Sequence, residues 1–179
     1  MTLLNFLRQQ YKLIMKIERI WAMPSRWTFS IKPIEKLLKQ EVGNGMLING
    51  LWCDPFAGKK SPAQITNDLN PKRHTEYHLD ALGFLKLQET DKYDGVLFDP
   101  PYSITQARDC YEKIGMDNLE VKPTSMEYWK NCKDEIKRIT KQGGKVICFG
   151  WNSMGLGLKR GFKMTRLLLV AHGGSKNDT

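Results

Sequence analysis

Long apolar runs, paired cysteines and cleavable leader sequences are all missing from this sequence. No stretch approaches the roughly 20 apolar residues that a bilayer-spanning helix needs, and the start lacks the cleavage region of a signal peptide. The four cysteines and three histidines show no metal-ligand spacing, which predicts buried thiols and no metal site. Repeats, low-complexity tracts and interdomain linkers are also missing. We therefore expect a soluble, cytoplasmic protein of one domain, residues 1–179, with no membrane partner.

Acidic residues are scarce relative to basic ones. The 28 Lys and Arg outnumber the 19 Asp and Glu, which gives a formal charge of +9 and a pI near 9.4. A surface of this sign attracts phosphates, so nucleic acid is the favoured partner. Basic proteins without a polyanionic partner also exist, and charge alone leaves both interpretations open.

The most informative segment is the apolar run Tyr93–Phe98, which ends in Asp99, Pro100, Pro101 and Tyr102. The run predicts a buried strand, and the two prolines stop it because neither has an N–H to donate to a neighbouring strand. Backbone carbonyls at the strand end are then left as acceptors. The Asp99 carboxylate adds another acceptor, and Tyr102 offers a ring for a planar base. An aromatic amine would fit between them.

These four residues resemble the DPPY signature of amino-group methyltransferases, which transfer a methyl group from S-adenosylmethionine to adenine N6 or cytosine N4. The resemblance implies that Asp99, Pro100, Pro101 and Tyr102 are the catalytic residues. A strand that runs into a proline-rich turn is the alternative interpretation of the same residues.

A second strand end is predicted at residues 51–53, which lead into Asp54, Pro55, Phe56, Ala57 and Gly58. This segment resembles the first cofactor motif of the same families, usually written DPFxGxG, in which glycine lets the backbone approach the ligand. The second glycine of that pattern is missing, because Lys59 and Lys60 follow. Pro62 is expected to shorten the helix that normally starts there.

Acidic residues follow the next two predicted strand ends. A candidate strand at residues 63–67 ends at Asp68, whose carboxylate would accept hydrogen bonds from the cofactor ribose. By resemblance, Asp80 and Ala81 would face the cofactor adenine. Asp80 is equally suited to cap a helix over residues 81–87, so both roles stay open.

Residues 28–38 resemble the segment that covers the methionine end of the cofactor. The resemblance assigns Phe29, Ser30 and Lys32 to the cofactor, with Ser30 or Lys32 pairing with its carboxylate. Pro33 is suited to a first helical turn, and an ordinary helix start is the alternative. The cofactor cover, the glycine strand, the two acids and DPPY occur in the order expected of the family.

The remaining pattern alternates between helices and strands. Helices are predicted over 103–114 and 125–140, the latter capped by Ser125 and ended by Gly143 and Gly144, and strands over 145–150 and 164–171. Alternation of this kind predicts an α/β fold, a three-layer sandwich with a mostly parallel sheet. By resemblance it is a Rossmann-like methyltransferase fold, with a catalytic core at 28–179.

The N-terminal segment, residues 1–27, is ambiguous. Residues 4–21 suit one face of an amphipathic helix, whereas 16–23 suit an edge strand. Met15 could be the biological start. Family members return from a strand like 167–171 in a hairpin, so the final strand is expected to be absent or supplied otherwise.

Together these features predict a methyltransferase that uses S-adenosylmethionine to methylate adenine N6 of DNA, with cytosine N4 second. The resemblance is to small phage or mobile-element enzymes, and it places the protein in the cytoplasm of a bacterium or phage-infected host. The duplex base would be flipped out, with Lys59 and Lys60 on phosphate. Specificity would need a homodimer or a separate partner. An RNA methyltransferase and an inactive nucleic-acid-binding relative are the alternatives.

Overall fold

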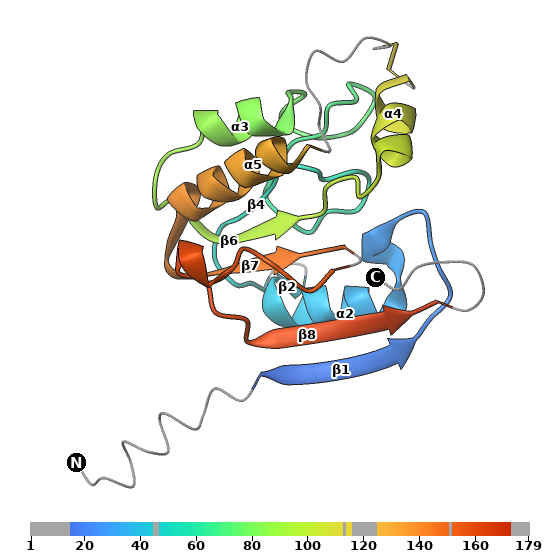
Figure 1. Ribbon diagram of the computed structural model, residues 1–179, viewed down its shortest axis with the longest axis vertical. Helices are drawn as coiled ribbons and strands as arrows, with labels where there is room; N and C mark the ends of the chain where they lie inside the picture. Colours follow the sequence, from blue (N-terminus) through green and yellow to red (C-terminus); the bar gives the residue numbers. More distant parts are fainter. Residues whose placement is uncertain (1–14, 45–46, 113, 116–124, 151, 173–179) are drawn as a thin grey trace, which may run out of the picture.

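The computed structural model describes residues 15–44, 47–112, 114–115, 125–150 and 152–172. Its centre is a four-stranded parallel sheet with helices on both faces (Figure 1). The elements are β1 (Lys16–Trp21), η1 (Thr28–Ser30), α2 (Lys32–Glu41), β2 (Gly43–Asn44), β3 (Leu47–Ile48), β4 (Trp52–Asp54), β5 (Ile65–Thr66), α3 (Ala81–Leu87), β6 (Tyr93–Phe98), α4 (Ile104–Glu112), α5 (Met126–Ile139), β7 (Thr140–Cys148), η2 (Leu158–Arg160) and β8 (Arg166–Ala171). The predicted α/β class with a mostly parallel sheet is confirmed.

The strands of the main sheet run in the order β5-β4-β6-β7, and every neighbouring pair is parallel. The chain goes from β4 outward to β5 and then returns to place β6 on the other side of β4. The strand order therefore reverses between β4 and β6, which is the position where open α/β sheets bind ligands.

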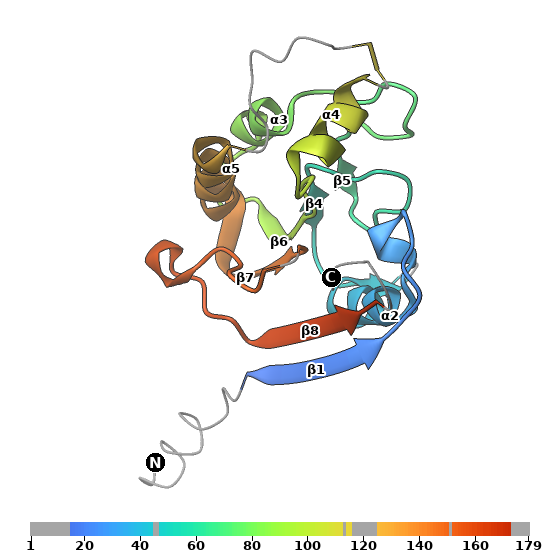
Figure 2. The same ribbon diagram turned by 45° about the vertical axis from the view of Figure 1, so that its right-hand side comes forward.

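Alternate residues of the central strands supply two separate cores. Val96 and Phe98 of β6 pack with α3 and α5 on one face, whereas Leu97 packs with α2 on the other. Figures 1 and 2 show α3 and α5 above the sheet, and α2 between the sheet and the β1–β8 pair. Burial on both faces explains why the run Tyr93–Phe98 is almost continuously apolar.

The helix starts agree with the sequence. Asp80 caps α3 by accepting hydrogen bonds from the backbone N–H groups of Leu82 and Gly83. Ser125 caps α5 by accepting one from Tyr128. Each cap satisfies a donor that has no partner within its helix.

The predicted end of α5 is wrong by several residues. The helix ends at Ile139 and β7 begins at Thr140, so Gly143 and Gly144 lie inside the strand. Gly143 has a φ of +78°, and the register against β6 shifts between its residues Tyr93 and Gly95. The glycines therefore mark a strand irregularity and not the helix end.

The segment after β4 departs from the expected helix. Residues 55–64 form turns without a helix, and β5 has two residues where five were predicted. Pro62 in this segment agrees with the expectation that no full helix starts there. Among the described cysteines, Cys110 is exposed, so the prediction of buried thiols is wrong at that position.

The edge strand predicted at residues 16–23 is confirmed as β1, and it supplies a partner for β8. The two strands pair in parallel from Lys16 opposite Arg166 to Trp21 opposite Ala171. Arg166 also forms ion pairs with Glu18 of β1 and Glu41 of α2. Helical character at residues 4–14 lies outside the described residues. Within the described chain, no helix has the length and apolar character to cross a membrane.

Gly95 is required where β6 passes β4. A Cβ at this position would lie 2.4 Å from the Trp52 ring, which is itself fully buried. Gly95→Ala should therefore lower the free energy of unfolding by about 3 kcal/mol or more, because the ring has no space to move into. Chemical denaturation measures the change. Gly83→Ala in α3 is the control, since its Cβ meets nothing within 4 Å, and it should raise stability by about 0.5–1 kcal/mol. Equal effects of the two substitutions would contradict this account.

Candidate functional site

The carboxyl ends of β4 and β6 bring the two sequence motifs together. Asp54 is the last residue of β4, and Asp99 directly follows β6, the neighbouring strand. Both therefore lie at the position where the strand order reverses. Their charges interact, because ionised Asp99 and Asp68 each raise the pKa of Asp54.

Asp54 forms the floor of the site. It is fully buried and accepts hydrogen bonds from Phe56 N (2.9 Å) and Ser61 Oγ (2.6 Å). Burial raises its pKa to about 7, although both hydrogen bonds oppose the shift. The partner Ser61 was not predicted, because a serine seven residues away in a loop carries no periodic signal.

Asp68 holds the turn that contains Gly58. Gly58, at φ +59°, donates its N–H to Asp68 Oδ2 (3.1 Å), and Asn70 N donates to Oδ1 (2.8 Å). Burial raises the pKa of the Asp68 carboxyl. Its side chain remains 20% exposed, so oxygen lone pairs remain accessible to a ligand.

Asn67 joins three segments beneath this turn and was missed by the sequence analysis. Its buried side chain donates to the carbonyl oxygens of Pro55 and Leu79, both at 3.0 Å, and accepts from Leu79 N at 2.9 Å. Its backbone carbonyl accepts from Ala57 N at 2.9 Å. These bonds fix the 54–58 segment against β5. An amide in a predicted strand, next to an acid, was the available signal.

Asp99 and Tyr102 are hydrogen-bonded to each other. The Tyr102 hydroxyl donates to Asp99 Oδ1, and the Thr28 side chain forms a second hydrogen bond to the carboxyl group. Burial raises the pKa of Asp99 to about 6, and burial together with the Asp99 charge raises the pKa of Tyr102. Pro100 is buried and Pro101 half-buried. Thr28 had been assigned only to the cofactor cover, so its contact with Asp99 was not predicted.

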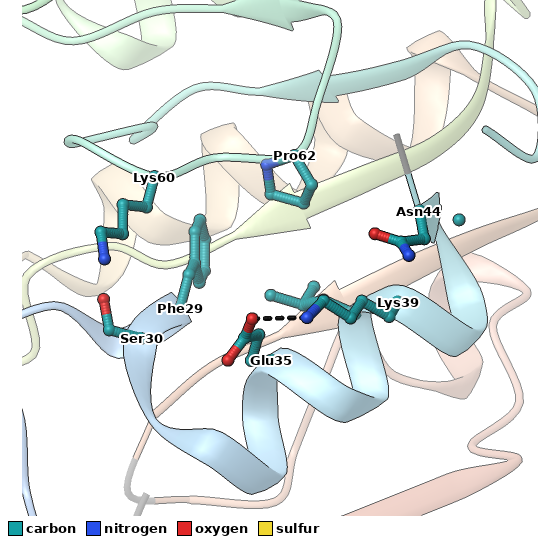
Figure 3. A pocket seen from close by; sticks show the side chains of 9 residues that line it. Phe29, Ser30, Glu35, Lys39, Asn44, Lys60 and Pro62 are labelled. Carbon is teal, nitrogen blue, oxygen red and sulfur yellow. Dashed lines mark hydrogen bonds and ion pairs between the residues drawn. The ribbon is translucent and has the colours of Figure 1, made fainter. Parts of the chain in front are cut away.

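A cavity of about 270 Å³ lies between α2 and the loop after β4 (Figure 3). Phe29 and Ser30 line it, and the Phe29 ring also packs against Phe149 at 5.0 Å. Ser30 Oγ is buried and has no hydrogen-bond partner among the described residues. Figure 3 shows the Lys60 side chain directed toward Ser30. Lys32, the other residue predicted to pair with a cofactor carboxylate, is exposed and does not line the cavity.

Asp80 lies in a different environment from the other acids. Its Oδ1 caps α3, and its Oδ2 accepts a hydrogen bond of 2.7 Å from the Tyr128 hydroxyl of α5. Ala81 is buried behind it. Both carboxylate oxygens thus have partners within the fold, which favours the capping role over the adenine contact.

The two lysines predicted to contact phosphate diverge. Lys59 Nζ lies 5.3 Å from the centre of the Trp27 ring, whereas Lys60 lines the cavity beside Ser30. Only Lys59 therefore shares a surface with other cations, and the Trp27 ring at its centre was not singled out from the sequence.

No group of three or more metal-ligating side chains occurs among the described residues. Comparisons with protein-family models, curated proteins and solved structures gave no match to this chain. The geometry of the site and the resemblance of its motifs are therefore the basis for assigning a function.

The raised pKa of Asp54 makes stability depend on pH. The unfolded carboxyl loses its proton near pH 3.8, and the folded one near pH 7. This contribution is fully present below about pH 4 and is lost as pH rises through about 7, with a slope of at most about 1.4 kcal/mol per pH unit. Asp54→Asn, whose amide can donate to Ser61, should remove this slope. Denaturation near pH 5 and pH 8 should show the variant gaining at least about 1 kcal/mol relative to wild type at the higher pH.

Asp109→Asn is the matched control, because Asp109 is an exposed residue of α4. Its stability relative to wild type should be the same at both pH values. The same pH dependence in wild type and Asp54→Asn would contradict the assignment of the raised pKa to Asp54.

Proposed function

We propose that this protein is an S-adenosylmethionine-dependent methyltransferase acting on the exocyclic amine of a DNA base, adenine N6 first and cytosine N4 second. The observation that carries the proposal is the position of Asp99 and Tyr102 directly beside the Asp54–Gly58 turn, where the strand order reverses. Two motifs that resemble the same enzyme families thus meet at the ligand-binding edge of the sheet. A Rossmann-like methyltransferase fold is part of the proposal.

The described residues fit the cofactor at three points. The left-handed Gly58 lets the backbone approach a ligand, and Asp68 keeps an exposed edge suited to ribose hydroxyls. The Ser30 hydroxyl is a buried polar group without a partner, and leaving such a group unpaired costs roughly 1–3 kcal/mol. A carboxylate bound in the adjoining cavity, close to Lys60, would satisfy it.

The cofactor supplies a methyl group activated on a positively charged sulfur. The lone pair of an adenine amine is delocalised into the ring, so the protein must aim the nitrogen and stabilise the charge that develops on it. Asp99 can accept a hydrogen bond from the amine and favour a pyramidal nitrogen. As the N–C bond forms and the C–S bond breaks, the amine loses one proton. With a pKa of about 6, Asp99 is mostly ionised at neutral pH and can accept.

Tyr102 would have two successive contacts in this mechanism. Its hydroxyl occupies Asp99 Oδ1, so the incoming amine and the tyrosine compete for the same acceptor. Entry of the base would displace the hydroxyl and leave the ring free to stack on the base. Stacking of this kind contributes roughly 1–3 kcal/mol, which offsets part of the cost of flipping a base from the duplex.

The net charge of +9 supports a nucleic-acid substrate. Methylation assays on duplex DNA, single-stranded DNA and structured RNA would distinguish a DNA enzyme from an RNA enzyme. Titration with labelled S-adenosylmethionine would separate both from an inactive binding protein, since that protein would show no saturable binding.

Asp99→Asn tests the proposed catalytic residue. The amide preserves the size of the side chain but removes the charge, so methyl transfer to duplex DNA should fall by a factor of about 10² or more. Cofactor affinity should change little, as calorimetric titration can show. The control Asp109→Asn should retain wild-type activity. Wild-type turnover by a folded Asp99→Asn protein would rule out this role.

Asp68→Ala and Asp80→Ala separate a cofactor ligand from a helix cap. Loss of the ribose contact in Asp68→Ala should weaken cofactor binding by roughly 1–3 kcal/mol. Asp80→Ala should lower the free energy of unfolding by about 1 kcal/mol, because α3 loses its cap, with cofactor affinity nearly unchanged. Titration and denaturation of both variants provide the comparison. If Asp80→Ala weakened cofactor binding and Asp68→Ala did not, the two assignments would have to be exchanged.

A further inference from the structure

Trp27 lies at the centre of a cluster of cations. The Arg26 and Arg73 guanidinium groups each lie 5.1 Å from the centre of its ring, and Lys59 Nζ lies 5.3 Å from it. These side chains come from three segments: the loop before η1, the loop after β4 and the loop after β5. We call Trp27, Arg26, Lys59 and Arg73 the Trp27 cluster. Each cation–π contact contributes about 0.5–1 kcal/mol at an exposed site.

The positive charge of the cluster is only partly balanced. Arg73 lies 3.9 Å from Asp68, whereas Arg26 and Lys59 form no ion pair with any described carboxylate. Elsewhere the fold pairs its arginines closely, as with Arg160 and Asp134 at 2.7 Å. Three like charges around one ring repel each other, and an anion placed among them would relieve that repulsion.

The cluster lies beside the proposed catalytic residues. Thr28, the residue after Trp27, hydrogen-bonds Asp99. The Trp27 ring also covers the glycine turn, since a Cβ on Gly58 would lie 3.9 Å from its Cζ3 atom. An anionic polymer bound here would therefore pass close to the site where the target base is to be methylated.

We infer that the Trp27 cluster is a binding site for the phosphodiester backbone of the DNA strand that carries the target base. The identity of the strand rests on the proposed function. Trp27 holds the three cations in place before DNA arrives, which reduces the side-chain entropy lost on binding. Lys60 is outside this site, because it lines the Ser30 cavity. The cluster thus fixes the position of the strand, while Asp99 and Tyr102 contact the base.

The test compares two triple variants with the same loss of charge. One carries Arg26→Gln, Lys59→Gln and Arg73→Gln. The control carries Lys86→Gln, Lys137→Gln and Lys163→Gln, which are exposed residues outside the Trp27 cluster. Fluorescence anisotropy with a labelled DNA duplex gives log Kd as a function of log salt concentration. The cluster variant should lose about 2–3 from the slope, close to 0.9 per phosphate contact, and the control much less.

Two further variants make the test independent of folding problems and of general charge. Lys59→Gln alone should reduce the slope by about one. Trp27→Leu keeps all the charges but releases the cations, so DNA affinity at fixed salt should fall about threefold to tenfold. Thermal melting checks that each variant is folded.

The outcomes separate this inference from the proposed function. Equal slope changes in the two triple variants would overturn it, and so would weakened cofactor binding in the cluster variant with an unchanged slope for DNA. If the wild-type protein bound DNA through the cluster but transferred no methyl group, the inference would stand and the proposed activity would fail. Saturable cofactor binding by a wild-type protein with no salt-dependent DNA binding would do the reverse.

Discussion

The pairing of β4 with β6 is the contact on which the candidate site depends. Trp52 lies opposite Gly95 in the register, and its ring fills the space that any side chain on Gly95 would need. This close approach sets β4 directly beside β6 and brings Asp54 and Asp99 to the same edge of the sheet. A shift in that register would move each acid along its strand and separate the two motifs.

The acids at this edge differ in what the fold asks of them. Asp54, Asp68 and Asp99 all have raised pKa values, with burial as the main cause in each case. Their mutual repulsion is tolerated because Ser61, Gly58 and Thr28 each supply a hydrogen bond. Structural acids on the far side of the sheet, such as Asp80, have their partners within a helix cap. Burial near like charges is typical of functional sites.

Local patterns predicted much of this arrangement, and contacts between distant segments account for what was missed. The run Tyr93–Phe98 and the caps Ser125 and Asp80 were readable because their signals lie within a few residues. The Asp99–Thr28 contact joins residues far apart in the chain, and the Trp27 cluster joins three loops. Neither has a spacing that periodicity could reveal. The early start of β7 reflects pairing with β6, which overrides the usual meaning of two adjacent glycines.

The parallel pairing of β1 with β8 constrains the order in which the chain can fold during synthesis. Arg166 and Glu18 are joined across 148 positions, so β1 leaves the ribosome long before its partner exists. At about 5–20 residues per second, β1 would wait several seconds with its backbone unpaired and with Ile17 and Trp21 exposed. Closing so long a loop is slow, and the central sheet can form first because β4 to β7 are complete before β8 emerges. A nascent chain of this protein would therefore present a sticky leading strand for most of its translation.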